Sequence, residues 1–151
     1  MKTFVDKEFA RSGSPAEVAG KIWATLRNAA ENGLSHGALE FFLRSDGPEG
    51  AGMSTSSLLI SWPPTPRGVA PAPERFAEAL AHRAGPRTDV AIIDLPAGRT
   101  IHLRGETTLD YHVRMPGDVG YFHLAFSVPL SGTEGPMGNL CDAIAHSLRW
   151  V

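Results

Sequence analysis

The sequence predicts a single α+β domain over residues 1–151. We expect a mostly antiparallel sheet of about six strands, with N- and C-terminal helices packed on its apolar face. Two observations lead to this class. A helical pattern lies near each end of the chain, and four strand-like segments follow one another in the second half with only short turn signals between them. Strands grouped together with helices at the ends are typical of α+β domains, and short connections indicate an antiparallel meander.

The first helix is predicted over about residues 15–31. Ser14 can cap its N-terminus, Pro15 suits the first helical position, and Glu17 completes a Ser-x-x-Glu capping box. The Asn-Gly pair at 32–33 is a natural stop, because glycine accepts the left-handed conformation that ends many helices. The apolar residues at helical spacing are Val18, Ile22, Leu26 and Ala29 or Ala30.

Two strands and a shorter helix follow. The segments 38–44 and 56–62 alternate between apolar and polar residues, which is the period of a half-buried strand. The proline-spaced connector at 63–73 is expected to be a loop between layers, with a polyproline ligand as the alternative. The next helix is predicted from Pro73 to Gly85.

The second half of the chain is predicted to be a meander that ends in a helix. Its strands are expected at 90–95, 100–104, 109–115 and 121–128, and its turns at 96–98, 105–107 and 116–119. The last helix begins near Pro136 and has one apolar stripe. The members of the stripe are Met137, Leu140, Cys141, Ile144 and Leu148.

Charge and cysteine content exclude several classes of protein. Lys plus Arg number 14 and Asp plus Glu number 16, whereas nucleic-acid-binding proteins normally carry a basic surplus. A single cysteine forms no internal disulfide and no zinc site with a second cysteine. The N-terminus lacks the apolar run of a signal peptide, and no stretch approaches 18 apolar residues. The sequence therefore predicts a cytoplasmic protein that has no membrane span and binds no nucleic acid.

Motifs for nucleotide binding and nucleophilic catalysis are weak. The glycine-rich segment 50–55 precedes a strand rather than a helix, so we expect a flexible hairpin loop instead of a phosphate-binding loop. No Gly-x-Ser-x-Gly elbow occurs. Cys141 lies in the apolar stripe beside Asp142, whose charge would raise the pKa of the thiol, so we expect a buried structural cysteine. We predict no catalytic residue and no cofactor.

Three histidines fall in consecutive strands of the meander, and we expect all three on the face opposite the apolar residues. The four-residue loop at 116–119 pairs Met115 with Gly120, which puts His112 directly across from His123. A three-residue turn at 106–108 would put His102 across from His112. A row of three imidazoles can hold a catalytic zinc with an open fourth position. A mixed polar interaction face and a plain solvated surface are the other two interpretations.

The aromatic residues near this face have two interpretations. If Phe42 and Trp62 share the face with Tyr121, they form an aromatic patch suited to a partner. If a helix covers the face, they belong to a second layer of core. The expected interaction face comprises His102, Arg104, His112, Arg114, Tyr121 and His123.

The C-terminal third contains Tyr121-Phe-His-Leu-Ala-Phe-Ser-Val-Pro-Leu and then Asn139-Leu-Cys-Asp-Ala-Ile-Ala-His-Ser-Leu-Arg-Trp. Over about the last 60 residues this resembles a group of small actinobacterial proteins. The element order is similar to that of the PsbP/DcrB/Mog-like α-β-α sandwich superfamily. Its members mostly act as non-catalytic binding parts, such as photosystem accessory subunits, GTPase-binding factors and chaperones of secreted toxins. The resemblance implies a protein-interaction role.

The combined expectation is a non-catalytic protein-interaction module, such as an adaptor or a secretion-associated chaperone, with another protein as its partner. A homodimer is an open alternative, because an exposed sheet edge or face favours one. A metal-dependent enzyme using His102, His112 and His123 is the rival from another class. A third alternative is a small-ligand carrier with a pocket between the helix layer and the sheet.

Overall fold

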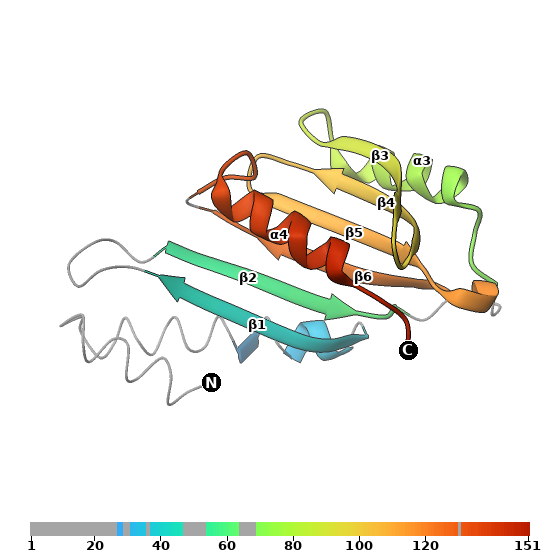
Figure 1. Cartoon of the computed structure of the whole chain (residues 1–151), viewed down its shortest axis with the longest axis horizontal. Coiled ribbons are helices and arrows are strands. Elements are labelled where there is room, and N and C mark those ends of the chain that lie inside the picture. Colours follow the sequence, from blue (N-terminus) through green and yellow to red (C-terminus); the bar gives the residue numbers. More distant parts are fainter. Residues whose placement is uncertain (1–26, 29–30, 36, 47–53, 64–68, 130) are drawn as a thin grey trace.

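The computed structural model describes residues 27–28, 31–35, 37–46, 54–63, 69–129 and 131–151, with the backbone alone at 41, 43–46 and 54–55. Six strands form one open antiparallel sheet in the order β1-β2-β6-β5-β4-β3 (Figure 1). The class predicted from the sequence, α+β with an antiparallel sheet, is confirmed. The strands are β1 (Ala38–Asp46), β2 (Ser54–Ser61), β3 (Asp89–Leu95), β4 (Gly98–Arg104), β5 (Thr108–Arg114) and β6 (Tyr121–Ser127). The helices are α3 (Pro73–Ala84), α4 (Pro136–Ser147) and the short 3-10 helix η2 (Pro116–Asp118).

Every predicted strand lies within two residues of an observed one, and the second and last helices begin at the predicted prolines. Most of the first predicted helix, 15–31, lies outside the described residues. Residues 27–28 and 31–35 are helical, so the helix continues through Gly33 instead of stopping there. Gly37 makes the turn into β1 at φ +87°, and a Cβ atom there would lie 2.6 Å from the carbonyl oxygen of Trp62. Only glycine fits this turn, because the left-handed backbone and the close carbonyl both exclude a side chain.

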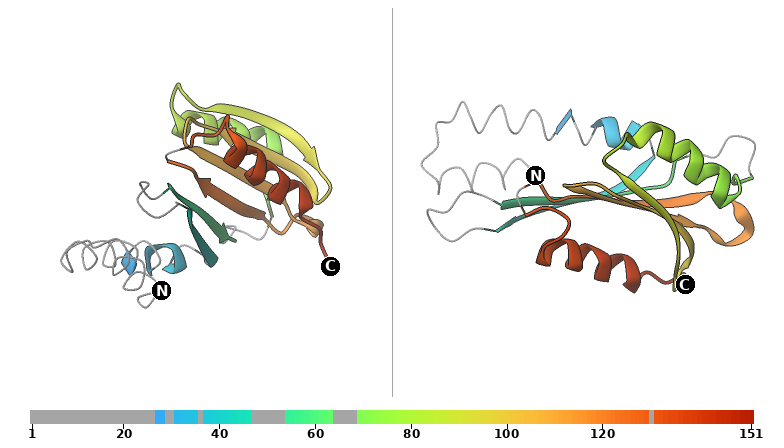
Figure 2. Two further views of the ribbon diagram at one scale, coloured as in Figure 1. Left: turned by 60° about the vertical axis from the view of Figure 1, so that its left-hand side comes forward. Right: turned by 90° about the horizontal axis from the view of Figure 1, so that it is seen from above.

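The sheet has two apolar faces, and the expectation of a single one is wrong. Helix α4 covers one face, whereas α3 and the helical residues 31–35 lie on the other side (Figure 2). The cluster between α4 and the sheet contains Leu95, Ala97, Leu109, Tyr111, Val113, Leu124, Phe126 and Val128, together with Cys141 and Ala145 of α4 itself. The cluster beneath α3 contains Ala70, Ile101, Leu103 and Tyr121, with Phe76, Ala77 and Leu80 packed against it.

The register between β4 and β5 explains why both faces are apolar. Arg104 pairs with Leu109 and Ile101 pairs with His112, one residue away from the expected alignment. Ile101 and Leu103 therefore face α3, while the apolar residues of β5 face α4, because side chains alternate between the faces of a sheet.

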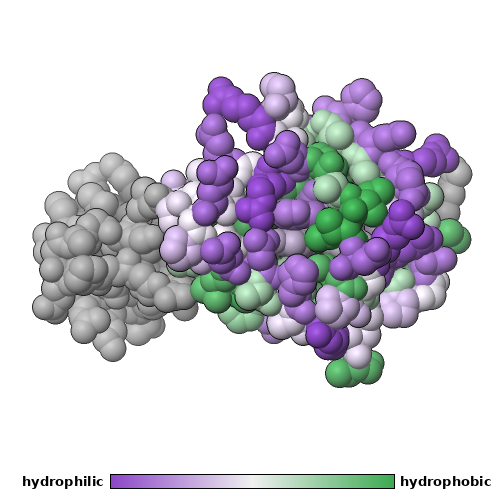
Figure 3. Space-filling model, turned by 45° about the horizontal axis from the view of Figure 1, so that its top comes forward, coloured by the Kyte–Doolittle hydropathy of each residue, from purple (hydrophilic) through white to green (hydrophobic). Residues whose placement is uncertain are grey.

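The described surface seen in Figure 3 is largely hydrophilic, with apolar residues gathered in patches between charged ones. Among the described helices, none has the length and apolar character needed to cross a membrane.

Candidate functional site

The expected row of three histidines is wrong, because the structure brings together only two of them. His112 pairs with His123 across β5 and β6, as the loop at 116–119 predicts. His102 instead pairs with Tyr111 and stacks on its ring, with the centroids 4.5 Å apart. The one-residue difference in register places His102 on the face that α4 covers and His112 on the face that α3 covers. Within the described part of the chain, no three His, Cys, Asp or Glu side chains are grouped so that they could hold a metal ion.

A polar cluster lies on the α3 face around His123. Its Nε2 lies 2.9 Å from Asp110 Oδ1, and its Nδ1 lies 3.3 Å from the Ser61 hydroxyl. The His112 ring stacks on His123 and meets the ring of Phe76 edge-on at 5.2 Å. Burial, followed by the neighbouring imidazole of His123, lowers the pKa of His112 to about 3. His112 is therefore neutral at physiological pH.

The order Ser61–His123–Asp110 has the composition of a nucleophilic triad, which neither the sequence spacing nor a motif indicated. A triad serine must reach the substrate carbonyl, and its base must lie within hydrogen-bond distance. The second condition is met here, but Ser61 is only 5% exposed. Burial of the hydroxyl keeps a substrate away, so the cluster satisfies buried polar groups across three strands.

A second polar cluster ties α4 to the sheet. The Nη2 atom of Arg104 lies 3.1 and 2.9 Å from the two carboxylate oxygens of Asp142, and its Nη1 donates to the Thr133 carbonyl at 2.9 Å. The Tyr111 hydroxyl donates to the same carboxylate. Burial alone would raise the pKa of Asp142, but the hydrogen bonds from Tyr111 and Arg104 and the charge of Arg104 lower it. Burial, followed by the charge of Arg104, lowers the pKa of His102.

The six residues of the expected interaction face therefore form two separate sets. His102 and Arg104 lie under α4, while His112, Arg114, Tyr121 and His123 lie on the α3 face. Tyr121 is buried and donates to the Pro71 carbonyl at 2.9 Å, and Arg114 pairs with Asp118 at 2.8 Å.

The expected aromatic patch is also divided. Phe42 is 51% exposed and lies on the α4 face, whereas Tyr121 is packed against Phe76 on the α3 face. Phe42 and Tyr121 therefore share no surface.

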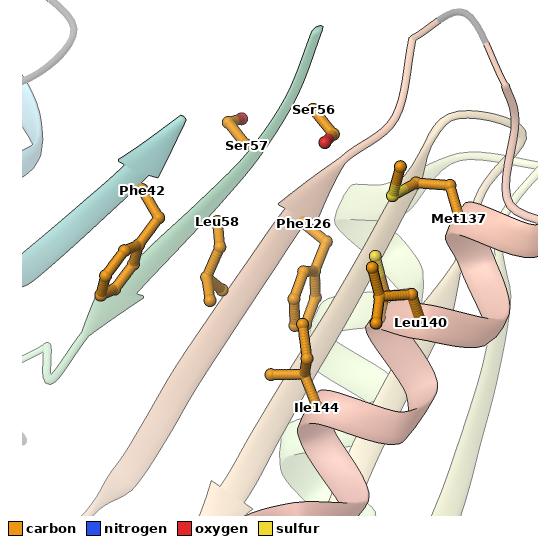
Figure 4. Close-up of a pocket in the computed structure, with 9 residues that line it drawn as sticks. Phe42, Ser56, Ser57, Leu58, Phe126, Met137, Leu140 and Ile144 are labelled. Carbon is orange, nitrogen blue, oxygen red and sulfur yellow. The ribbon is translucent and has the colours of Figure 1, made fainter. Parts of the chain in front are cut away.

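An apolar groove of about 390 Å³ lies between α4 and the neighbouring strands β1, β2 and β6 (Figure 4). Leu58 and Phe126 form its floor, and side chains of α4 form one wall. Phe42 stands on the opposite side, and Ser56 and Ser57 lie at one end. The α4 residues in the lining are Met137, Leu140, Cys141 and Ile144.

The groove exists because α4 covers only part of its sheet face. The apolar stripe of α4 is wider than the core beneath it: Cys141 and Ala145 are buried, whereas Leu140 and Ile144 are each 39% exposed. The sequence predicts this stripe but does not separate a filled core from a pocket between the helix and the sheet. The lateral position of α4 could not be predicted from the sequence. In this position α4 leaves β1 and β2 uncovered beside the exposed edge of the stripe.

Comparison with known proteins finds no matching family model, no matching curated protein and no matching solved structure.

A second hollow, of about 420 Å³, lies near the β4–β5 turn. Its charges are mixed, and Arg104 within it is already paired with Asp142. Its Arg87 and Glu106 form an exposed ion pair at 3.7 Å. The apolar groove is thus the candidate site, since none of its described lining residues is charged and Phe42, Leu140 and Ile144 remain open to solvent.

Proposed function

We propose that the protein is a non-catalytic binding module whose ligand site is the groove beside α4. The observation that carries this proposal is the contiguous and partly open apolar lining, in which no described residue is charged. Leaving apolar surface in water costs about 25 cal/mol per Å², so a folded chain gains nothing from such a surface unless a ligand covers it. Ligand sites are typically concave, mostly apolar and between about 300 and 1,000 Å³ in volume.

The chemistry of the lining supports binding rather than catalysis. Its polar side-chain groups are the hydroxyl of Ser56 and the thiol of Cys141. Burial, followed by the charge of Asp142, raises the pKa of Cys141, which disfavours the nucleophilic thiolate. A general acid or base is absent from the nine lining residues.

Binding of the neutral dye Nile red tests this proposal. Leu140→Glu places a charge on the wall of the groove, and Ala143→Glu places the same charge at an exposed position of α4 outside the lining. We expect a fluorescence increase with the native chain and with Ala143→Glu, and a loss of at least about tenfold in affinity with Leu140→Glu. Circular dichroism checks that both variants are folded. Equal binding by the two variants, or no dye binding to the native chain, would contradict the proposal.

A second candidate is the adaptor or secretion-associated chaperone implied by the resemblance to the PsbP/DcrB/Mog-like superfamily. It is favoured by β1, which is an edge strand of the described sheet and exposes Leu39 at 55% and Phe42 at 51%. An extended segment of another protein, or of a second copy, could pair with such an edge. Leu39→Lys should then release a partner that co-purifies with the native chain, or convert a dimer to a monomer in sedimentation. Unchanged assembly of the folded variant would refute this candidate.

A further inference from the structure

We infer that the groove binds the uncharged aliphatic tail of a small amphiphile and leaves the polar head of that molecule at the end marked by Ser56. This inference rests on the proposed function, because it names the ligand of the same site.

The size of the groove favours a small molecule over a folded partner. Along α4 the lining runs from Met137 to Ile144, which is about 10 Å at 1.5 Å per residue. Across the sheet it runs from β1 to β6, two strand spacings or about 10 Å. A floor of roughly 100 Å² is far below the approximately 800 Å² that each partner buries in a stable protein–protein interface. The volume of about 390 Å³ lies within the range of small-molecule sites.

The charge of the lining determines which part of the ligand it can hold. None of the nine lining residues is charged. An ionised group placed among them would lose its hydration without gaining a counter-ion, which is strongly unfavourable. The part of the ligand inside the groove is therefore uncharged, and any charged head remains in water.

The arrangement of side chains gives the ligand a direction. Met137, Leu140 and Ile144 project from α4 toward Phe42 and Leu58, and Ser56 lies at the end opposite Ile144 (Figure 4). Methionine and leucine side chains change rotamer easily and adapt to a flexible chain. The tail therefore lies along α4 toward Ile144, and the polar end meets Ser56.

Displacement of Nile red by a series of straight-chain alcohols, from hexanol to decanol, tests the inference. Each added methylene should improve displacement about threefold to fourfold until the groove is full. Decanoate should displace the dye within a few-fold of decanol, because its carboxylate stays in water. In calorimetry, Leu140→Glu should weaken direct binding of decanol at least about tenfold, whereas Ala143→Glu should leave it unchanged.

The outcomes test the class of ligand and the location of the binding site separately. Suppose that the native chain binds the dye and Leu140→Glu does not, but that no alcohol displaces the dye or displacement is independent of chain length. The aliphatic inference is then overturned, whereas the proposal of a binding groove stands. Displacement by a short amphipathic helical peptide alone would assign the groove to a partner helix and would also overturn it. If neither the dye nor decanol binds in calorimetry, both the inference and the proposed function fail.

Discussion

His112 and His123 face each other across β5 and β6 with ring centroids 4.1 Å apart and ring planes only 6° from parallel. His123 is held between Asp110 and Ser61, whereas His112 is enclosed by the His123 ring and Phe76. A positive charge on His112 would be buried and would lie directly against the His123 ring.

The His112 ring makes the stability of the fold sensitive to acid. Burial, followed by His123, lowers the pKa of His112 to about 3, whereas the unfolded chain takes up this proton near 6.5. Between these values the unfolded state binds more protons, so the free energy of unfolding falls as the pH falls from about 6.5 toward 3. We expect His112 to contribute a slope of roughly 1 kcal/mol per pH unit in urea unfolding, and His112→Gln to remove it.

His82→Gln is the matched control, because His82 is exposed on α3. It should keep the native slope. The pKa of His102 is also lowered by burial, so part of the acid sensitivity should remain in His112→Gln. A His112→Gln variant with the full native slope would refute this assignment.

Of the two strand registers beside β5, one could be predicted from the sequence and the other could not. The β5–β6 alignment was predictable because a four-residue turn with proline and glycine separates two clear strands. The β4–β5 alignment was not, because distant residues hold that turn. Thr133 donates its N–H to the Glu106 carbonyl at 3.0 Å and its hydroxyl to the Gly105 carbonyl at 2.7 Å. No local pattern reveals these contacts, so the face of His102 could not be predicted.

The Arg104–Asp142 pair should contribute more stability than an exposed pair. Each of these side chains is 32% exposed, and Asp142 also accepts from Tyr111. Asp142→Asn leaves the Arg104 guanidinium without its counter-ion, so we expect a loss of about 2–4 kcal/mol in the free energy of unfolding.

The exposed pair of Arg99 and Glu74 provides the comparison. Its side chains are 54% and 58% exposed, with 3.1 Å between the paired atoms. Glu74→Gln should cost less than about 1 kcal/mol, because water screens an exposed pair. Equal losses in the two variants, measured by urea unfolding, would show that the Asp142 cluster does not hold α4.

The groove could be predicted only in part from the sequence. The stripe of α4 follows from its helical period, but the division between core and groove depends on where α4 lies on the sheet. Gly138 sets that position, since a Cβ atom there would lie 1.8 Å from the Thr133 carbonyl oxygen. A contact between a helix backbone and a loop carbonyl is not visible in the sequence.

Gly138→Ala should therefore displace α4 and destabilise the fold. The Thr133 carbonyl is backbone and cannot move aside easily, so we expect a loss of at least about 3 kcal/mol together with loss of dye binding. Gly85→Ala is the matched control: its φ is +77°, but a Cβ atom there has no neighbour within 4 Å. Its ψ of 175° places it in a region that is nearly exclusive to glycine, so it should cost about 1–3 kcal/mol through backbone conformation alone and should leave dye binding intact. Undiminished dye binding by a folded Gly138→Ala variant would show that the close approach of α4 is unimportant.

Cys141 reports whether α4 stays closed over the core, because it is the single cysteine of the chain and only 4% exposed. Burial, followed by the charge of Asp142, raises the pKa of its thiol, and the thiolate is the reactive form. At pH 8, iodoacetamide should modify the folded chain at least about a hundredfold more slowly than the urea-unfolded chain. Asp142→Asn should speed the reaction, both by loosening α4 and by removing the charge that raises the pKa of the thiol, whereas Glu74→Gln should not. A folded-state rate within a few-fold of the unfolded rate would mean that the thiol of Cys141 is open to solvent, which would contradict a closed core beneath α4.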